Sequence, residues 1–482
     1  MSSTGKKVAI IGCVVAIVLI LCCSATAVAY YLLRDKDGPD YESPKFDMQL
    51  GEEIQSMVKD IGTNGGKLEV TDSSDPLYGA KIEIPENHLD ETEEISLGHK
   101  TPTDVNIPED LNLLGDVIVL DKSSERMFLH PVSVTLPYDT SLATIGEAIG
   151  VYEYDEETGT IQATTLVEHD AENGTIQFLT THFSTFLIIE LEKLWSDIMA
   201  LDYDTGFRPK DNGWFIKNWG AYITDNGNCL GMSAVSQYIY SHQSVIDNTF
   251  YEVWREGDKD DQKDDVIANE LAARVQMSLV DRWNSLAVDL NRFDKRDQPD
   301  PSSLAGQAIL MNFLVTEEPQ VLYVMTYYKK YNAAGEWEWA TANHHAILTY
   351  KYENGKFAIY DPNYPYRSGS SDWEKDVTYT WADGFGVYSP RGTGGYNYVR
   401  HIGPNLVTKI DIISKLITKA KAGFPDDDFP EITFTSPEED EVITEKSVVV
   451  SGTISGMSYL LDADENYIHW YYQNEEGGLD HL

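Results

Sequence analysis

The sequence predicts a multidomain chain made of an N-terminal transmembrane helix, an all-β sandwich, an α+β domain and a C-terminal β module. Three observations predict this. One long apolar run lies near the N-terminus, short alternating strands follow it, and a helical region then leads into apolar strands. The 482 residues, 42% of them hydrophobic, can bury more than one core. We expect boundaries that divide the chain into 1–34, 35–60, 61–192, 193–405, 406–430 and 431–482.

The first segment is predicted to be a membrane anchor. Lys6 and Lys7 precede an essentially uncharged run over 8–33, which exceeds the roughly 20 residues that span a bilayer. The positive-inside tendency places the N-terminus in the cytoplasm and everything after the polar stalk at 35–60 on the extracellular side. A cleaved signal peptide with its site at Ala27-Val28-Ala29, giving a secreted protein, is the alternative.

Charge and cysteine usage restrict the classes of partner. The formal net charge of −43 argues against nucleic acid and anionic membrane surfaces. Three of the four cysteines, Cys13, Cys22 and Cys23, lie in the apolar run, so we expect no disulfide framework. The acidic segments lack the ligand spacing of a Ca²⁺ loop. We therefore expect no metal and no cofactor.

Short strands separated by turns follow the stalk and predict a β-sandwich over 61–192. We expect strands at 67–70, 80–85, 117–120 and 132–137. The order Gly65-Gly66, Ile84-Pro85-Glu86 and 128–132 (Phe-Leu-His-Pro-Val) resembles the sandwich domain shared by netrin receptors and ankyrins. That resemblance implies an interaction module that contacts a cell-surface protein.

The last strand of this sandwich begins beside His182-Phe183-Ser184. Relatives of this domain in death-domain signalling proteins cut themselves at His-Phe-Ser. The resemblance implies that the Ser184 hydroxyl attacks the carbonyl of Phe183 with help from His182, which requires a strained peptide. The other interpretation is a strand whose Phe183 and Phe186 fill the core.

Cys229 is the one cysteine outside the apolar run. The turn Gly227-Asn228 precedes it, and Met232, Val235 and Ile239 follow at helical spacing, so a buried helix should begin at Cys229. The positive end of the helix dipole favours the nucleophilic thiolate there.

A histidine and an aspartate are predicted to lie together on a hairpin. A strand that begins near His345 is followed by a turn at 353–356 and a second strand over 357–360, which ends at Asp361. Both residues should therefore lie at the open end of the hairpin. With Cys229 they form the set that cysteine acyl transfer needs, with Asn363 as an alternative to Asp361 for orienting the imidazole.

The combination of Gly-Asn-Cys-x-Gly-Met, His-Ala and Asp-Pro-Asn resembles the papain-like cysteine peptidase superfamily in its prokaryotic, extracellular type. The resemblance covers roughly 195–405 and implies a two-lobed α+β fold, with Cys229 as nucleophile, His345 as general base and acid, and Asp361 as orienter. Ile223 occupies the position where that family keeps an oxyanion glutamine. Asn226 or Asn228 is then the expected side-chain donor beside the backbone N–H of Cys229.

Further elements complete the chain. Helices are expected at 266–275 and 305–314, a strand at 320–325, and an amphipathic helix with Leu406, Ile410, Ile413 and Ile417 on one face. Strands at 432–437 and 448–453 resemble the start of an immunoglobulin-like sandwich. The segment 431–482 is shorter than the ~100 residues of a complete domain of that type, so a partial module is expected.

These features predict an exported, membrane-anchored cysteine peptidase that hydrolyses peptide bonds in a peptide or protein substrate. A cell-surface adhesion or scaffold protein with a non-catalytic peptidase-like domain is one alternative. A transglutaminase-like acyl transferase is another, although that family keeps its cysteine and histidine closer in sequence.

Overall fold

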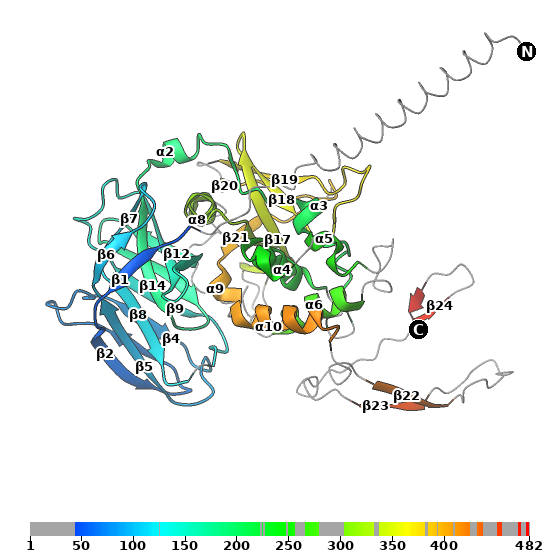
Figure 1. The fold of residues 1–482 in the computed structure, drawn as a ribbon, viewed down its shortest axis with the longest axis horizontal. Helices are drawn as coiled ribbons and strands as arrows, with labels where there is room; N and C mark the ends of the chain where they lie inside the picture. Colours follow the sequence, from blue (N-terminus) through cyan, green and yellow to red (C-terminus); the bar gives the residue numbers. More distant parts are fainter. Residues whose placement is uncertain are drawn as a thin grey trace, which may run out of the picture. The chain divides into compact units, whose positions relative to one another are not determined.

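The computed structural model describes 44–124, 126–221, 224, 227–246, 249–255, 266–278, 303–331, 337–380, 384–392, 394–407, 410–424, 431–436, 451–455, 471–473 and 479–481. The predicted anchor at 8–33 lies outside these ranges, and no helix within them is long and apolar enough to cross a bilayer. β-Sheet dominates the described residues, and helices are fewer (Figure 1).

The first half of the described chain is a two-layer β-sandwich. Its larger sheet has the strand order β11-β10-β14-β8-β5-β2 with β7 on β14, its smaller sheet has the order β12-β13-β9-β4-β3, and β1 pairs with β6. One apolar cluster takes Leu97 from the larger sheet and Val134 from the smaller, so the two sheets enclose a shared core. The strands are β1 (Asp47–Leu50), β2 (Ile54–Ile61), β3 (Gly66–Glu69), β4 (Lys81–Ile84), β5 (Glu93–Lys100), β6 (Pro102–Asn106), β7 (Leu111–Leu113), β8 (Val117–Lys122), β9 (Val132–Pro137), β10 (Ala148–Asp155), β11 (Thr160–Ala163), β12 (Thr165–Asp170), β13 (Thr175–Thr180) and β14 (Thr185–Leu191).

The second half is built around another antiparallel sheet, of order β20-β19-β18-β17-β16-β21 with β15 on β17. Helix α4 packs against β17 and β16, α6 packs against α4, and α10 packs against α6 (Figure 1). The elements are α2 (Trp195–Ile198), β15 (Tyr203–Asp204), α3 (Pro209–Asn212), α4 (Cys229–Ser241), the 3-10 helix η1 (Gln243–Val245), α5 (Phe250–Val253), α6 (Val266–Met277), α8 (Ser303–Val315), β16 (Gln320–Tyr331), β17 (Trp337–Glu353), β18 (Lys356–Tyr360), β19 (Lys375–Thr380), β20 (Gly384–Phe385), β21 (Tyr398–Ile402), α9 (Pro404–Val407) and α10 (Ile410–Lys421).

Helix α8 joins the sandwich to the second sheet. A continuous apolar cluster includes Tyr152 of β10, Ile309 of α8 and Leu322 of β16. The hydroxyl of Tyr152 donates to Oδ1 of Asn312 at 3.0 Å within this buried region. The sandwich therefore packs directly against the part of the chain that carries Cys229.

A second contact joins the two halves near β21 and α9. The Thr181 hydroxyl donates to the Asn405 carbonyl at 3.0 Å, and the Asn405 amide donates to the Leu179 carbonyl at 3.1 Å. The N–H of Gly403 donates to Thr165 Oγ1 at 2.8 Å, and a Cβ on Gly403 would approach the Ala163 carbonyl oxygen to 2.5 Å. Only glycine lets the backbones approach this closely.

The predicted strands of the sandwich are confirmed as β3, β4, β8 and β9, and the predicted helices at 266–275 and 305–314 as α6 and α8. The single amphipathic helix expected through Leu406 and Ile417 is wrong. Leu406 lies in the short α9, and Ile413 and Ile417 bury their side chains from α10. Pro404 at the first position of α9 starts a separate helical turn.

The last described segments are two strand pairs. β22 (Glu431–Ser436) pairs with β23 (Ser451–Ser455), and β24 (Tyr471–Gln473) pairs with β25 (Leu479–His481), both antiparallel. The first pair lies close to the strands expected at 432–437 and 448–453. An immunoglobulin-like module here remains a prediction.

Candidate active site

Cys229 is the first residue of α4, as the turn before it predicts. The helix is buried on every side from Cys229 to Tyr240, and Cys229 itself is 7% exposed. The first turn of α4 packs closely on α6. A Cβ added to Gly231 would clash with the carbonyl oxygen of Ala272 and would lie 2.8 Å from the backbone nitrogen of Gln276, both in α6. The close packing at Gly231 therefore fixes the position of Cys229 relative to α6.

His345 lies in the middle of β17, and the prediction that it starts the strand is wrong. Val324 pairs with His345 and Thr326 with Ala342, so two residues of β17 oppose one of β16. Asn343 takes a left-handed φ of 51° in this bulge. A β-bulge turns side chains from the regular alternation of a strand, and this one immediately precedes His345.

The structure brings Cys229, His345 and Asp361 together. Nε2 of His345 lies 2.7 Å from Oδ1 of Asp361, and the imidazole also hydrogen-bonds to the Cys229 side chain. Since Nε2 faces the carboxylate, Nδ1 is the ring nitrogen left for the thiol. His345 is 3% exposed and Asp361 is fully buried. The hairpin of β17 and β18 places the pair, as predicted.

The electrostatics of this group favour the charged histidine. Burial by itself lowers the pKa of His345, but the negative charge of Asp361 and the hydrogen bonds to Asp361 and Cys229 outweigh burial and raise the pKa to about 10. For Asp361, burial raises the pKa, while His345, Tyr388 and the backbone N–H of Asn363 together hold the pKa below its usual range. An imidazolium beside a carboxylate is thus the stable form.

Tyr388 holds the second oxygen of the carboxylate. Its hydroxyl donates to Oδ2 of Asp361 at 2.6 Å, while the Asn363 N–H donates to Oδ1 at 2.8 Å. Burial and the adjacent Asp361 charge raise the pKa of Tyr388 well above its ordinary value, so it remains a donor. Both oxygens of Asp361 are therefore held in place.

Asn363 lies beside the same imidazole. Its Nδ2 is 3.1 Å from Nε2 of His345, farther than Oδ1 of Asp361, so Asp361 is the nearer of the two expected orienters. Asn218 donates from Nδ2 to Oδ1 of Asn363 at 3.1 Å and accepts at Oδ1 from the backbone N–H of Asn228. Asn218 thus connects the start of α4 to the turn after β18.

The sequence does not identify three further residues of the site, which are Asn218, Tyr388 and Tyr396. Tyr396 stacks on His345 at 5.9 Å between ring centroids and 29° between planes, and its own backbone pairs with that of Tyr388. Burial is the main reason that the pKa of Tyr396 rises to about 12. No local pattern marks Asn218, Tyr388 or Tyr396, because each reaches the site through a long-range contact.

The two expected oxyanion donors differ in what the structure describes. Asn226 lies outside the described residues. Asn228 is buried, and its Oδ1 accepts a hydrogen bond from Thr224 Oγ1. Its Nδ2 is buried and has no hydrogen-bond partner among the described residues. A buried amide donor next to Cys229 is therefore left free to bind an acceptor.

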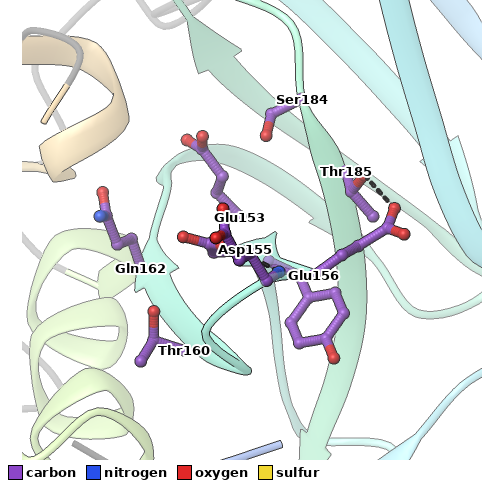
Figure 2. Close-up of a pocket in the computed structure, with 9 residues that line it drawn as sticks. Glu153, Asp155, Glu156, Thr160, Gln162, Ser184 and Thr185 are labelled. Atoms are coloured by element: carbon purple, nitrogen blue, oxygen red, sulfur yellow. Dashed lines mark hydrogen bonds between the residues drawn. The ribbon is translucent and has the colours of Figure 1, made fainter. Parts of the chain in front are cut away.

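The His182-Phe183-Ser184 segment lies in the sandwich, between β13 and β14. Nε2 of His182 lies 3.0 Å from Oε1 of Glu153, and Phe183 packs edge-on against Phe128 with ring centroids 4.9 Å apart. Ser184 and Glu153 line one acidic hollow of about 360 Å³. Figure 2 shows how their side chains lie around it. Neither Phe183 nor Ser184 has a positive φ. Self-cleavage remains a prediction.

Within the part of the chain that the structure describes, no group of three His, Cys, Asp or Glu side chains is placed to hold a metal ion. Comparison with protein-family models and with curated protein sequences finds no match to this chain.

Proposed function

We propose that this protein is a cysteine peptidase that hydrolyses peptide bonds with Cys229, His345 and Asp361. The observation that carries the proposal is the buried His345 imidazole, which hydrogen-bonds to the Cys229 side chain and lies 2.7 Å from the Asp361 carboxylate. A thiol, a base and an orienting carboxylate in this order form the constellation of nucleophilic acyl transfer.

The proposed reaction follows from these contacts. His345 takes the Cys229 proton at Nδ1, and the imidazolium is stabilised by Asp361, in keeping with a pKa of about 10. The Cys229 thiolate attacks the peptide carbonyl carbon, and the carbonyl oxygen becomes an oxyanion. His345 then protonates the leaving amine as the C–N bond breaks. Water attacks the resulting thioester with His345 as base, which releases the acid and restores the thiol.

The oxyanion needs preorganised donors. We assign the backbone N–H of Cys229 and Nδ2 of Asn228 to this role, since that Nδ2 is buried and has no partner within the described part of the chain. Loss of a single oxyanion donor typically costs about 10²–10³ in kcat. The Asn228→Ala variant should lose activity on this scale.

The proposed peptidase also has a proposed domain organisation. We infer a papain-like domain over 193–405, a sandwich of the netrin-receptor and ankyrin type over 61–192 that contacts a cell-surface partner, and a partial immunoglobulin-like module over 431–482. The run at 8–33 would anchor the protein with these parts on the extracellular side.

The test uses the full chain, purified in detergent, with a mixture of natural peptides and mass spectrometry of the products. Cleavage by the wild type that is absent from Cys229→Ala supports the peptidase. Cys229→Ser is the matched control for shape, because it keeps a hydroxyl at the same position without thiolate chemistry. Cleavage that continues in Cys229→Ala would assign the activity elsewhere.

A second candidate function is a scaffold that binds peptides without cutting them. The low exposure of Cys229, at 7%, favours it, because a substrate carbonyl must reach the sulfur. Peptide binding by the wild type without any cleaved product would support the scaffold. A stable thioester transferred to an added amine in preference to water would support the acyl transferase.

A further inference from the structure

Two cations lie beside the catalytic turn of a strongly acidic protein. Tyr364 follows Asn363, and its N–H donates to the Asp361 carbonyl at 2.8 Å. The Nε of Arg391 donates to the Tyr364 hydroxyl at 3.2 Å, and the Nζ of Lys375 lies 4.4 Å from the centre of the same ring. Two positive side chains from separate elements thus converge on one tyrosine of the site.

Arg391 lies in a loop whose two ends contact the proposed catalytic residues Asp361 and His345. The loop begins at Tyr388, which binds Asp361, and ends at Tyr396, which stacks on His345. Arg391 lies between them and is exposed. The charge of Arg391 lowers the pKa of Tyr396, while those of Asp361 and Cys229 raise it, so all three lie within electrostatic range of this ring. Arg391 is therefore near the reacting atoms without taking part in the triad.

Neither cation is neutralised by a carboxylate among the described residues. Within the described residues, Arg391 and Lys375 both contact Tyr364, and Asp376, next to Lys375, pairs instead with Lys356 at 3.2 Å. Acidic residues outnumber basic ones by 79 to 36, yet neither of these two cations pairs with a carboxylate of the described residues. The tyrosine also restrains both long side chains, which reduces the entropy lost when they bind an anion.

We propose that Arg391 and Lys375 form a substrate subsite that binds a carboxylate of the peptide, either an acidic side chain near the scissile bond or the peptide's C-terminus. This inference rests on the proposed peptidase function and names its substrate class. Guanidinium and ammonium groups are the natural donors to a carboxylate, and the planar fork of Arg391 can bind both oxygens.

Whether an acidic peptide is preferred or disfavoured distinguishes this subsite from the long-range electrostatic field of the protein. A protein of charge −43 repels an acidic peptide over long distances, so a surface without a local cation site would disfavour glutamate relative to glutamine. A preference for the charged peptide can arise only from local contacts.

The experiment compares peptides that differ by a single Glu or its isostere Gln on each side of the cleaved bond, each with a free or an amidated C-terminus. For the wild-type full chain we expect kcat/KM to be roughly three- to tenfold higher with the carboxylate, as two partly exposed ion pairs allow. In the Arg391→Gln/Lys375→Gln double variant the ratio should fall to one or below. The Glu and free-acid arms identify which carboxylate is bound.

A matched control is Lys351→Gln, because Lys351 pairs with Glu353 at 2.9 Å on β17 and belongs to neither the triad nor the subsite. Its ratio should equal that of the wild type. The same peptides are also titrated against Cys229→Ala by fluorescence anisotropy, which measures the subsite without catalysis. Equal binding of all peptides by Cys229→Ala would overturn the subsite, and so would a preference for the carboxylate that persists when Arg391→Gln and Lys375→Gln are added to Cys229→Ala. If Cys229→Ala binds the carboxylate peptides preferentially but the wild type cleaves none of them, the peptidase function is overturned and the subsite is not.

Discussion

At the scale of residues, the candidate site is a chain of charges and hydrogen bonds buried away from water. Tyr388 donates to Asp361, Asp361 binds His345, and His345 reaches Cys229. Each member keeps the next in one protonation state and one orientation. Cys229, His345 and Asp361 could be predicted because a glycine turn and a hairpin leave local patterns. Tyr388 could not, since its role depends on where a distant loop folds back.

The Tyr388→Phe variant tests this chain of contacts. It leaves Oδ2 of Asp361 without its tyrosine donor, so we expect a loss of about 1–3 kcal/mol in the free energy of unfolding. We also expect kcat/KM to fall about tenfold or more, because the carboxylate loses its fixed orientation. Denaturant titration and peptide hydrolysis measure the two effects. Tyr152→Phe is the control, because it removes a buried hydroxyl that donates to Asn312 and lies outside the site. Equal losses of activity in both variants would contradict a positioning role for Tyr388.

The raised pKa of His345 gives a pH dependence with a definite sign. The folded pKa of about 10 exceeds the unfolded value of 6.5, so the charged imidazole stabilises the fold fully below pH 6.5. That contribution is lost as the pH rises toward 10. The stability advantage of the wild type over His345→Gln should therefore shrink between pH 6.5 and 10, as measured by denaturant titration at each pH. An advantage that grows over this interval would contradict the assignment.

At the scale of elements, the site depends on a helix start and a bulged strand. The start of α4 at Cys229 follows from the turn chemistry of Gly227 and Asn228. The bulge at Asn343 was not predictable, because it is a mismatch between β17 and β16 and appears only when the two strands are paired. A strand assigned from its own residues alone therefore begins too late, which puts His345 at its start.

Gly231→Ala tests the packing of α4 on α6. The added Cβ would clash with backbone atoms of Ala272 and Gln276, which cannot rotate away. We expect a cost of about 1–3 kcal/mol in unfolding free energy, typical of overpacking, and a further loss of activity as Cys229 moves from His345. Ala234→Gly in the same helix removes a methyl group instead and should lower stability by about 1 kcal/mol through helix propensity. A Gly231→Ala variant with wild-type melting temperature and kcat/KM would show that this contact does not position Cys229.

At the scale of the whole molecule, the sandwich and the site-bearing sheet pack on a shared apolar cluster. Sequence patterns located both parts but not this contact, because residues such as Tyr152 and Ile309 look like ordinary core residues in either part. The polar contacts of Asn405 and Gly403 add to it. The sandwich is thus packed directly against the part of the chain that carries Cys229.

Calorimetry of the full chain tests this coupling. We expect the sandwich and the part that carries Cys229 to unfold in one transition, because separating them exposes the apolar surface around α8. Thr181→Val, which removes the hydroxyl that donates to the Asn405 carbonyl, should lower that single transition. Two resolved transitions, with only the lower one shifted by Thr181→Val, would show that the two parts fold independently.

The measurement that tests the central claim most directly is the rate of alkylation of Cys229 by a small haloacetamide as a function of pH. A charged His345 beside the thiol predicts that Cys229 is alkylated faster in the wild type than in His345→Ala at neutral and acidic pH. His345→Ala should slow the reaction at Cys229, and in Cys229→Ala only the labels on Cys13, Cys22 and Cys23 should remain. A wild-type rate equal to that of His345→Ala at every pH would contradict an activated nucleophile at this site.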